Sequence, residues 1–237
     1  ELLNPLKREG LERLSLTTNG ILLKKYARSL EGVDDFNVSL DTLKEEKFRR
    51  LAGGNLKDVL MGLEEVKKCG INIKLNCVLI KGLNDDEIKD LVFYSWQEGF
   101  FIRFIEYMPF GKRERWDDKK IVKKDEILKI LSAFGKFYEE RKAHSVSTNY
   151  LREDGKGFGI ISPLSEPFCF DCNRIRITSS GYLIPCIENE KKYFIKEIIS
   201  SKDRAEKIAF IKNILCKKEK GTKESFRSPF ELVSLGG

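Results

Sequence analysis

The chain has 237 residues, of which 41% are hydrophobic and 34% are charged, and this is enough for one large globular domain or one domain with an appendage. No apolar run reaches the length of about 18 residues that a membrane-spanning helix needs, and the first residues resemble no targeting peptide, so we expect a cytoplasmic protein without membrane partners. The formal net charge of +7 favours polyanionic ligands without choosing among nucleotide, nucleic acid and membrane surface.

The first part of the chain alternates between strand and helix patterns. Residues 11–18 alternate apolar and polar side chains before a turn at Asn19-Gly20, and residues 34–41 repeat the strand pattern after a helix that Gly32 ends. Strands alternating with helices at this spacing predict right-handed βαβ units and a parallel sheet. The later elements continue the order: a helical stripe within 44–69, strand 71–80, helix 87–97 and strand 101–108.

The pattern changes after Pro109, where a polar, charge-dense stretch precedes a short amphipathic helix at 126–134. We therefore expect a domain boundary here, with domains 1–110 and 111–237. The second domain is predicted to contain short antiparallel strands at 136–140, 145–152 and 157–162. A hairpin over 174–186, turning at Ser180-Gly181, and a helix from Tyr193 to Cys216 are predicted to follow.

Three of the six cysteines form a spaced group, Cys169, Cys172 and Cys186. The predicted hairpin can bring the third thiol back beside the first two, and converging thiolates suit an iron–sulfur cluster or zinc. A zinc site would need a fourth ligand, and the only histidine, His144, is distant in sequence. The spacing alone leaves open, in this order, a structural metal, a functional cluster and plain thiols. The remaining cysteines, Cys69, Cys77 and Cys216, stand alone and are read as ordinary, often buried residues.

Arg174 and Arg176 follow the second cysteine closely and share one strand face because they are two residues apart. Two guanidinium groups beside a metal site can clamp a phosphate. The alternative is a solvated strand face.

Several segments together resemble the GTP 3′,8-cyclase family (molybdenum cofactor biosynthesis protein A) of the radical S-adenosylmethionine (SAM) superfamily. The resemblance spans essentially the whole chain, and it depends on the order of the segments and on the cysteine spacing joined to Asn-Arg-x-Arg-x-Thr. The segments are LTTNG (16–20), NVSLD (37–41), KLNCVLIKGLNDDEI (74–88), RFIEYMP (103–109), FCFDCNRIRIT (168–178) and the final Gly236-Gly237.

The resemblance implies an α/β fold: a partial, truncated radical SAM (βα)6 TIM-like barrel followed by a C-terminal α+β cluster-binding domain. In that domain Cys169, Cys172 and Cys186 would hold an auxiliary [4Fe–4S] cluster whose open iron binds GTP. The complete enzyme would also use SAM and a second [4Fe–4S] cluster.

Residue by residue, the resemblance assigns binding roles and no catalytic side chain. The alternatives are surface cations for Lys74 and Arg103, core packing for Ser39 and Met108, and a frayed end for the two terminal glycines. The implied sets are Thr17, Lys74, Arg103, Arg174, Ile175 and Arg176 for GTP, Ser39 and Met108 for SAM, and Gly236 and Gly237 as a tail that enters the active site.

The implied reaction cleaves SAM to a 5′-deoxyadenosyl radical, abstracts hydrogen from C3′ of the GTP ribose and joins C3′ to guanine C8. The product, 3′,8-cyclo-7,8-dihydroguanosine 5′-triphosphate, would pass to cyclic pyranopterin monophosphate synthase. The family's Cys-x3-Cys-x2-Cys loop and Gly-Gly-Glu-Pro strand do not occur in these 237 residues, so we expect an N-terminal truncation and a chain that is inactive alone.

Two other readings stay open. One is a zinc-stabilised module that binds nucleic acid, although no recognised nucleic-acid motif is present and a nucleic-acid partner is not expected. The other is a different radical SAM enzyme with an auxiliary cluster. The sequence also leaves homodimer formation open.

Overall fold

The computed structural model describes residues 10–30, 32–109, 117–169, 172–187 and 191–216. The chain divides into two compact units. The first unit consists of the described residues within Glu1–Tyr107, Lys119–Lys142 and Ser147–Ser162. The second unit consists of those within Met108–Asp118, Ala143–Val146 and Pro163–Gly237.

The first unit contains a seven-stranded mixed sheet in the order β1-β2-β3-β4-β7-β6-β5. Strands β1 to β4 are parallel, β7 is parallel to β4, and β6 and β5 are antiparallel to their neighbours. The predicted parallel sheet is thereby confirmed. The strands are β1 (Ser15–Thr18), β2 (Asp35–Ser39), β3 (Asn72–Leu79), β4 (Phe101–Glu106), β5 (Tyr138–Arg141), β6 (Thr148–Leu151) and β7 (Gly157–Ile161).

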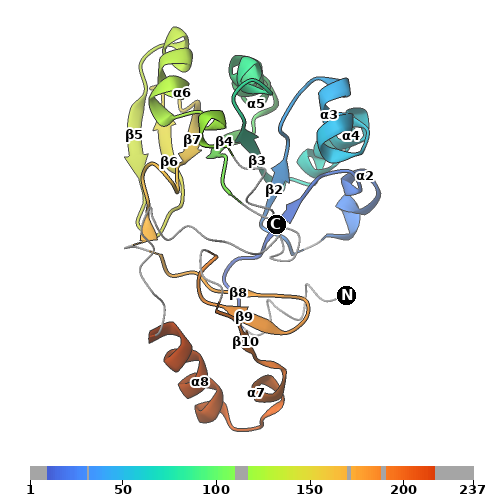
Figure 1. The fold of residues 1–237 in the computed structure, drawn as a ribbon. Coiled ribbons are helices and arrows are strands. Elements are labelled where there is room, and N and C mark those ends of the chain that lie inside the picture. Colours follow the sequence, from blue (N-terminus) through green and yellow to red (C-terminus); the bar gives the residue numbers. More distant parts are fainter. Residues whose placement is uncertain (1–9, 31, 110–116, 170–171, 188–190, 217–237) are drawn as a thin grey trace. The chain divides into compact units, whose positions relative to one another are not determined.

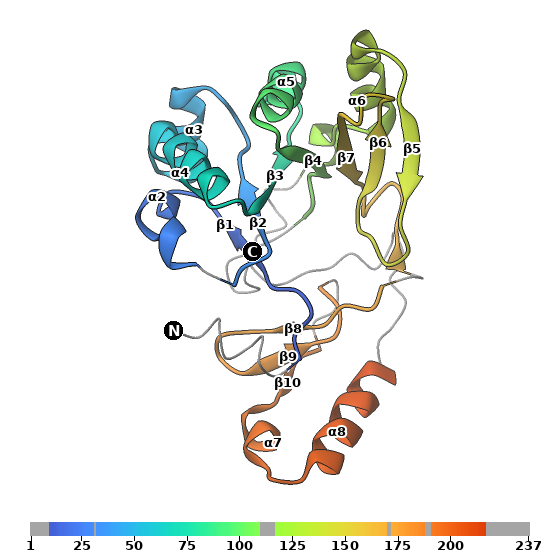
Figure 2. The same cartoon turned by 180° about the vertical axis from the view of Figure 1, so that it is seen from behind.

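Helices cover one face of this sheet, as both ribbon views show (Figures 1 and 2). The segment expected to be helical within 44–69 forms two helices, because the chain turns at Gly53, whose φ of 71° suits glycine. The second of them is capped by Asn55, which precedes its first residue and whose side chain accepts a hydrogen bond from the Lys57 amide at 2.9 Å. The helices are α2 (Leu23–Tyr26), α3 (Glu45–Ala52), α4 (Leu56–Lys68), α5 (Ile88–Glu98) and α6 (Lys124–Leu131).

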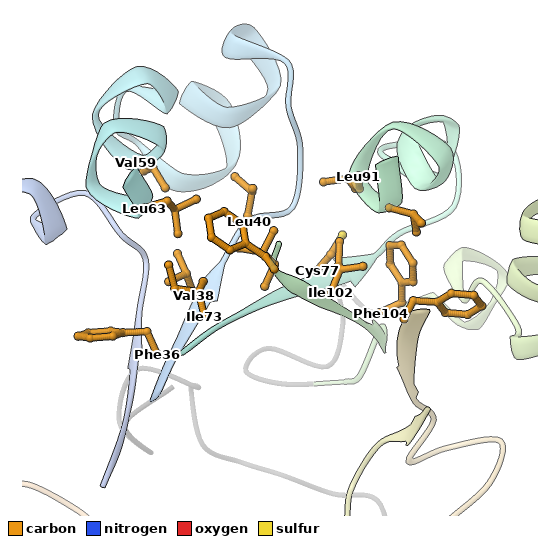
Figure 3. Close-up of a cluster of buried hydrophobic side chains, with 14 of the residues drawn as sticks. Phe36, Val38, Leu40, Val59, Leu63, Ile73, Cys77, Leu91, Ile102 and Phe104 are labelled. Atoms are coloured by element: carbon orange, nitrogen blue, oxygen red, sulfur yellow. The ribbon is translucent and has the colours of Figure 1, made fainter. Parts of the chain in front are cut away.

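The core lies between the sheet and these helices (Figure 3). Alternate strand residues such as Val38 and Ile102 point toward the helices, and Leu63 of α4 and Leu91 of α5 belong to the same buried cluster. All four are fully buried. Because successive strand side chains point to opposite faces, this packing leaves the intervening residues of β1 to β4 on the other face.

The strands predicted for the second domain join the first unit's sheet instead. Strand β7 pairs with β4, with Phe158 opposite Ile102, and the Trp96 indole of α5 donates a hydrogen bond to the Gly157 carbonyl at 2.8 Å. The expected domains 1–110 and 111–237 stay a prediction, whereas most of residues 136–162 belong to the first compact unit. The reason is that β7 provides backbone partners and a buried aromatic ring for β4, which would otherwise be an edge strand.

The second unit contains a three-stranded antiparallel sheet in the order β10-β9-β8. The predicted hairpin turn is confirmed, since the Gly181 amide bonds to the Thr178 carbonyl at 3.0 Å. The helix expected from Tyr193 is wrong at its start, because β10 pairs with β9 there and the helical residues are split in two. The elements are β8 (Arg176–Ile177), β9 (Tyr182–Ile184), β10 (Tyr193–Phe194), α7 (Lys196–Ser200) and α8 (Arg204–Cys216).

In the part of the chain that the structure describes, no helix has both the length and the apolar character needed to cross a membrane.

Candidate functional site

The sheet face opposite the helices carries four of the predicted site residues. Thr17 of β1 lies opposite Asn37 of β2, which lies opposite Lys74 of β3. Two residues further along the strands, Ser39 lies opposite Asn76, which lies opposite Arg103 of β4. We call these two rows the polar face: Thr17, Asn37 and Lys74, with Ser39, Asn76 and Arg103. The strand register therefore brings Thr17, Ser39, Lys74 and Arg103 to one face, where cations and hydroxyl groups alternate with amides.

Arg103 lies across two neighbouring strands of the polar face. Its Nε donates to the Asn76 Oδ1 at 2.9 Å, and one terminal nitrogen donates to the Asn37 Oδ1 at 2.6 Å. Asn37 in turn donates through its Nδ2 to the Ser15 Oγ at 3.0 Å. This chain of hydrogen bonds joins β1, β2, β3 and β4 and fixes the plane of the guanidinium group.

Lys74 is held by a charge. Its Nζ lies 2.9 Å from the Asp35 Oδ1, and Arg13 forms an ion pair with the same carboxylate. The hydrogen bond from Arg13 is the largest cause that holds the pKa of Asp35 well below its usual range, and Lys74 acts in the same direction. The Asp35 side chain is only 1% exposed, so this carboxylate is a fixed part of the site.

The loops that follow β2 and β3 are joined by buried polar groups. Asn84 donates to the carbonyls of Asp41 and Val78 at 2.8 and 2.9 Å and accepts from the Ile80 amide at 2.8 Å. The Asp41 carboxylate accepts from the Val78 amide at 2.8 Å, and burial raises the pKa of this carboxyl group. Two of the family-like segments, 37–41 and 74–88, thus form one hydrogen-bonded edge at the carboxyl ends of parallel strands, where α/β proteins place their ligands.

Not every predicted residue belongs to this face. Met108 follows β4 but falls in the second compact unit. Gly236 and Gly237 lie outside the residues that the structure describes.

The predicted cysteine site lies in the second unit. The Cys172 amide donates a hydrogen bond to the Cys169 carbonyl at 3.4 Å, which holds these two residues close together. In the β8–β9 register Arg176 lies opposite Ile184, and the hairpin therefore carries Cys186 back toward Cys172. Among the described residues, no three His, Cys, Asp or Glu side chains are arranged to hold a metal ion, so the ligand set stays a prediction.

The donor set nevertheless fits the predicted cluster in its chemistry. Three sulfur ligands on a turn and a returning hairpin match the soft donors that iron–sulfur clusters use, with one iron left open. Burial is the largest influence on the pKa of Arg176 and lowers it, whereas Cys186 and Cys172 act electrostatically in the opposite direction. The two thiols therefore lie within electrostatic range of this guanidinium group.

The two arginines after Cys172 have different surroundings. One terminal nitrogen of Arg174 donates to the His144 carbonyl at 3.1 Å, and its guanidinium carbon lies 5.5 Å from the Phe168 ring centroid. Arg176 is part of β8, and Ile175 between them is 38% exposed.

The lone cysteines also differ, since Cys77 is buried in the core while Cys69 and Cys216 are exposed.

The sequence alone did not identify the residues that hold the predicted binding side chains, Lys74 and Arg103, in place. Asn37 and Asn76 occupy strand positions two residues from Ser39 and Lys74, and this alternation was a usable signal. Asp35 gave no local signal, because its importance depends on Arg13 and Lys74, which reach its carboxylate from outside its own strand.

Comparison with known proteins identifies the family. Residues 100–224 match the family model described as Molybdenum Cofactor Synthesis C, and residues 1–94 match the Radical SAM superfamily model. Among solved structures, the chain is similar to one titled "Native anSMEcpe with bound AdoMet and Cp18Cys peptide", at 18% identity and a TM-score of 0.49, covering 98% of this chain and 74% of that chain.

Curated relatives carry the name GTP 3′,8-cyclase. The chain is 41% identical to the protein of Thermodesulfovibrio yellowstonii over 84% of this chain and 64% of that protein. It is 37% identical to the Aquifex aeolicus protein, over 83% of this chain and 63% of that one, and 43% identical to the Campylobacter lari protein, over 81% and 60%. The chain thus spans less than two thirds of the length of these relatives. It belongs to the radical SAM proteins of molybdenum cofactor synthesis, as a homologue of the GTP 3′,8-cyclases.

Proposed function

We propose that this chain provides the GTP-binding and auxiliary-cluster parts of a GTP 3′,8-cyclase of molybdenum cofactor biosynthesis. The observation that carries the proposal is the polar face, where Thr17, Lys74 and Arg103 lie together in a homologue of enzymes with that name. Lysine and arginine side chains are the usual partners of a triphosphate. Ser39, in the same row as Arg103, is the proposed SAM contact on this face. Met108 is the other residue proposed to contact SAM.

In the second unit, Cys169, Cys172 and Cys186 would hold the auxiliary [4Fe–4S] cluster. When bound, the cluster supplies an open iron to which the substrate can bind. The contribution of the chain is to fix the three thiolates on the turn and the hairpin. Arg174, Ile175 and Arg176, which follow the turn directly, are the proposed GTP contacts of this unit.

We also propose that these 237 residues alone do not catalyse turnover, because they contain no Cys-x3-Cys-x2-Cys segment to hold the cluster that cleaves SAM. Anaerobic incubation of the reconstituted chain with SAM, GTP and a reductant is expected to give no cyclised nucleotide. Formation of the cyclised product would refute this part of the proposal alone.

The experiment that tests the binding function is anaerobic reconstitution with iron and sulfide, followed by measurement of iron content and of the visible spectrum with and without GTP. About four irons per chain and a spectrum that GTP perturbs are the expected results. Stoichiometric zinc, no response to GTP and salt-dependent binding of DNA or RNA would instead favour a zinc-stabilised nucleic-acid module.

A further inference from the structure

The carboxylate of Asp35 is shared by two cations of the first unit. Arg13 binds both of its oxygens, because the Nε donates to the Oδ2 at 2.8 Å and a terminal nitrogen donates to the Oδ1. Lys74 donates to the same Oδ1 at 2.9 Å. The Asp35 side chain is 1% exposed, whereas those of Arg13 and Lys74 are 60% and 29% exposed. A buried negative charge therefore has two cationic partners that both reach solvent.

The ion pair with Asp35 holds Lys74 toward the amino ends of the strands. In the β2–β3 register Lys74 lies opposite Asn37, and Asp35 lies two residues earlier on β2, opposite Asn72. Parallel α/β folds bind their ligands at the opposite end, where the strands finish. A phosphate group that Lys74 binds at that end must therefore compete with Asp35 for the ammonium group.

Arg13 is placed to keep the carboxylate if Lys74 leaves it. The Leu14 amide donates to the Asp34 Oδ2 at 2.7 Å, and the Leu14 carbonyl accepts from the Asp34 amide at 2.9 Å. The residue after Arg13 is thus tied to the residue before Asp35. A guanidinium group that binds both oxygens of a carboxylate is a strong partner with a specific geometry. Departure of Lys74 consequently leaves the buried charge paired, which avoids the large cost of an unpaired one.

We propose that Arg13 and Asp35 are positioning residues that hold Lys74 before GTP binds and release it to the triphosphate. This inference rests on the proposed function, in which Lys74 contacts GTP. Before binding, Asp35 orders the long lysine side chain, which lowers the cost of ordering it later. On binding, Lys74 exchanges the carboxylate for a phosphate, and Arg13 keeps the carboxylate neutralised. Arg13 thus affects GTP binding through Asp35 and not by touching GTP.

The test uses the full chain, reconstituted anaerobically, and compares the dissociation constants of GTP and guanosine. Arg13→Gln is expected to weaken GTP binding about fivefold, because Asp35 then retains Lys74. Asp35→Asn is expected to tighten GTP binding about threefold, because the carboxylate no longer competes with the phosphates. Guanosine, which has no phosphate, should bind both variants as it binds the wild type.

The double variant decides how Arg13 acts. If Arg13 acts through Asp35, adding Arg13→Gln to Asp35→Asn should change GTP affinity less than about twofold. A fivefold loss that persists in the Asp35→Asn background would mean that Arg13 attracts GTP directly, and the proposal would be wrong. Arg49→Gln is the matched control, because it removes an exposed arginine of α3 that pairs with Glu45 and changes the net charge equally. It should affect neither ligand.

The outcomes also separate this inference from the proposed function. If Lys74→Ala weakens GTP binding but Arg13→Gln does not, the exchange is wrong and the proposed function stands. If Lys74→Ala leaves GTP binding unchanged, the assignment of Lys74 to GTP fails, and the inference fails with it. Should Arg13→Gln lose guanosine binding because it is misfolded, Asp35→Asn decides, since asparagine keeps the size and one acceptor oxygen. Unchanged or weaker GTP binding by that variant would overturn the proposal.

Discussion

Gly159 is a position where a single added methyl group would test the packing of the polar face. Gly159→Ala puts a Cβ atom 3.0 Å from the Arg103 Cγ, 3.2 Å from the Asn149 Oδ1 and into the Ser147 Oγ. The Ser147 hydroxyl would have to leave its 3.1 Å hydrogen bond to Asn149. Overpacking of a buried strand costs about 1–3 kcal/mol and a lost hydrogen bond about 1 kcal/mol, so we expect the free energy of unfolding to fall by about 2–4 kcal/mol.

Urea unfolding followed by circular dichroism measures this loss, and the melting temperature should fall by roughly 5–12 °C for a chain of this length. Adding Ser147→Ala to the Gly159→Ala variant removes the closest clash and should restore part of the lost free energy of unfolding. Gly99→Ala is the comparison for backbone strain alone, because its φ is 73° and a Cβ atom there meets nothing within 4 Å; about 1 kcal/mol is expected. Wild-type stability of Gly159→Ala would refute the packing argument, and equal losses at both glycines would mean that crowding contributes nothing.

Three further substitutions test other parts of the molecule. Asp35→Asn removes the negative charge that pairs with Arg13 and Lys74. The free energy of unfolding should fall by only about 1–2 kcal/mol at pH 7, because both cations are partly exposed to solvent. Because the folded pKa of Asp35 lies below its unfolded value, that difference should shrink as the pH falls below about 4, and a pH-independent difference in urea unfolding would contradict the ion-pair account. Asn84→Ala leaves three backbone groups without their side-chain partner and should lower the free energy of unfolding in urea by about 2–4 kcal/mol. A loss below about 0.5 kcal/mol would show that water replaces the lost hydrogen bonds. Cys172→Ser should lower the iron content after reconstitution, with Cys69→Ser as the control that retains it; equal iron in both would remove Cys172 from the ligand set.

Much of the architecture follows from local pattern in the sequence. Alternation in 34–41 and 71–80 predicted the strands that carry Ser39 and Lys74, because a strand directs successive side chains to opposite sides. The turn at Ser180-Gly181 followed from the residue types that tight hairpins prefer. The segments that resemble the cyclase family also contain the four side chains that the sheet brings to one face, Thr17, Ser39, Lys74 and Arg103.

Other features depended on contacts between residues far apart in the chain. The pattern of 157–162 predicted a strand but not its partner, and only the folded sheet placed β7 parallel to β4. Arg103 and Asn37, 66 residues apart, meet because β2 and β4 lie on either side of β3. Alternation determines the face on which a side chain lies, whereas the neighbour it meets is decided by strand order and register. These in turn depend on the packing of the whole sheet against its helices.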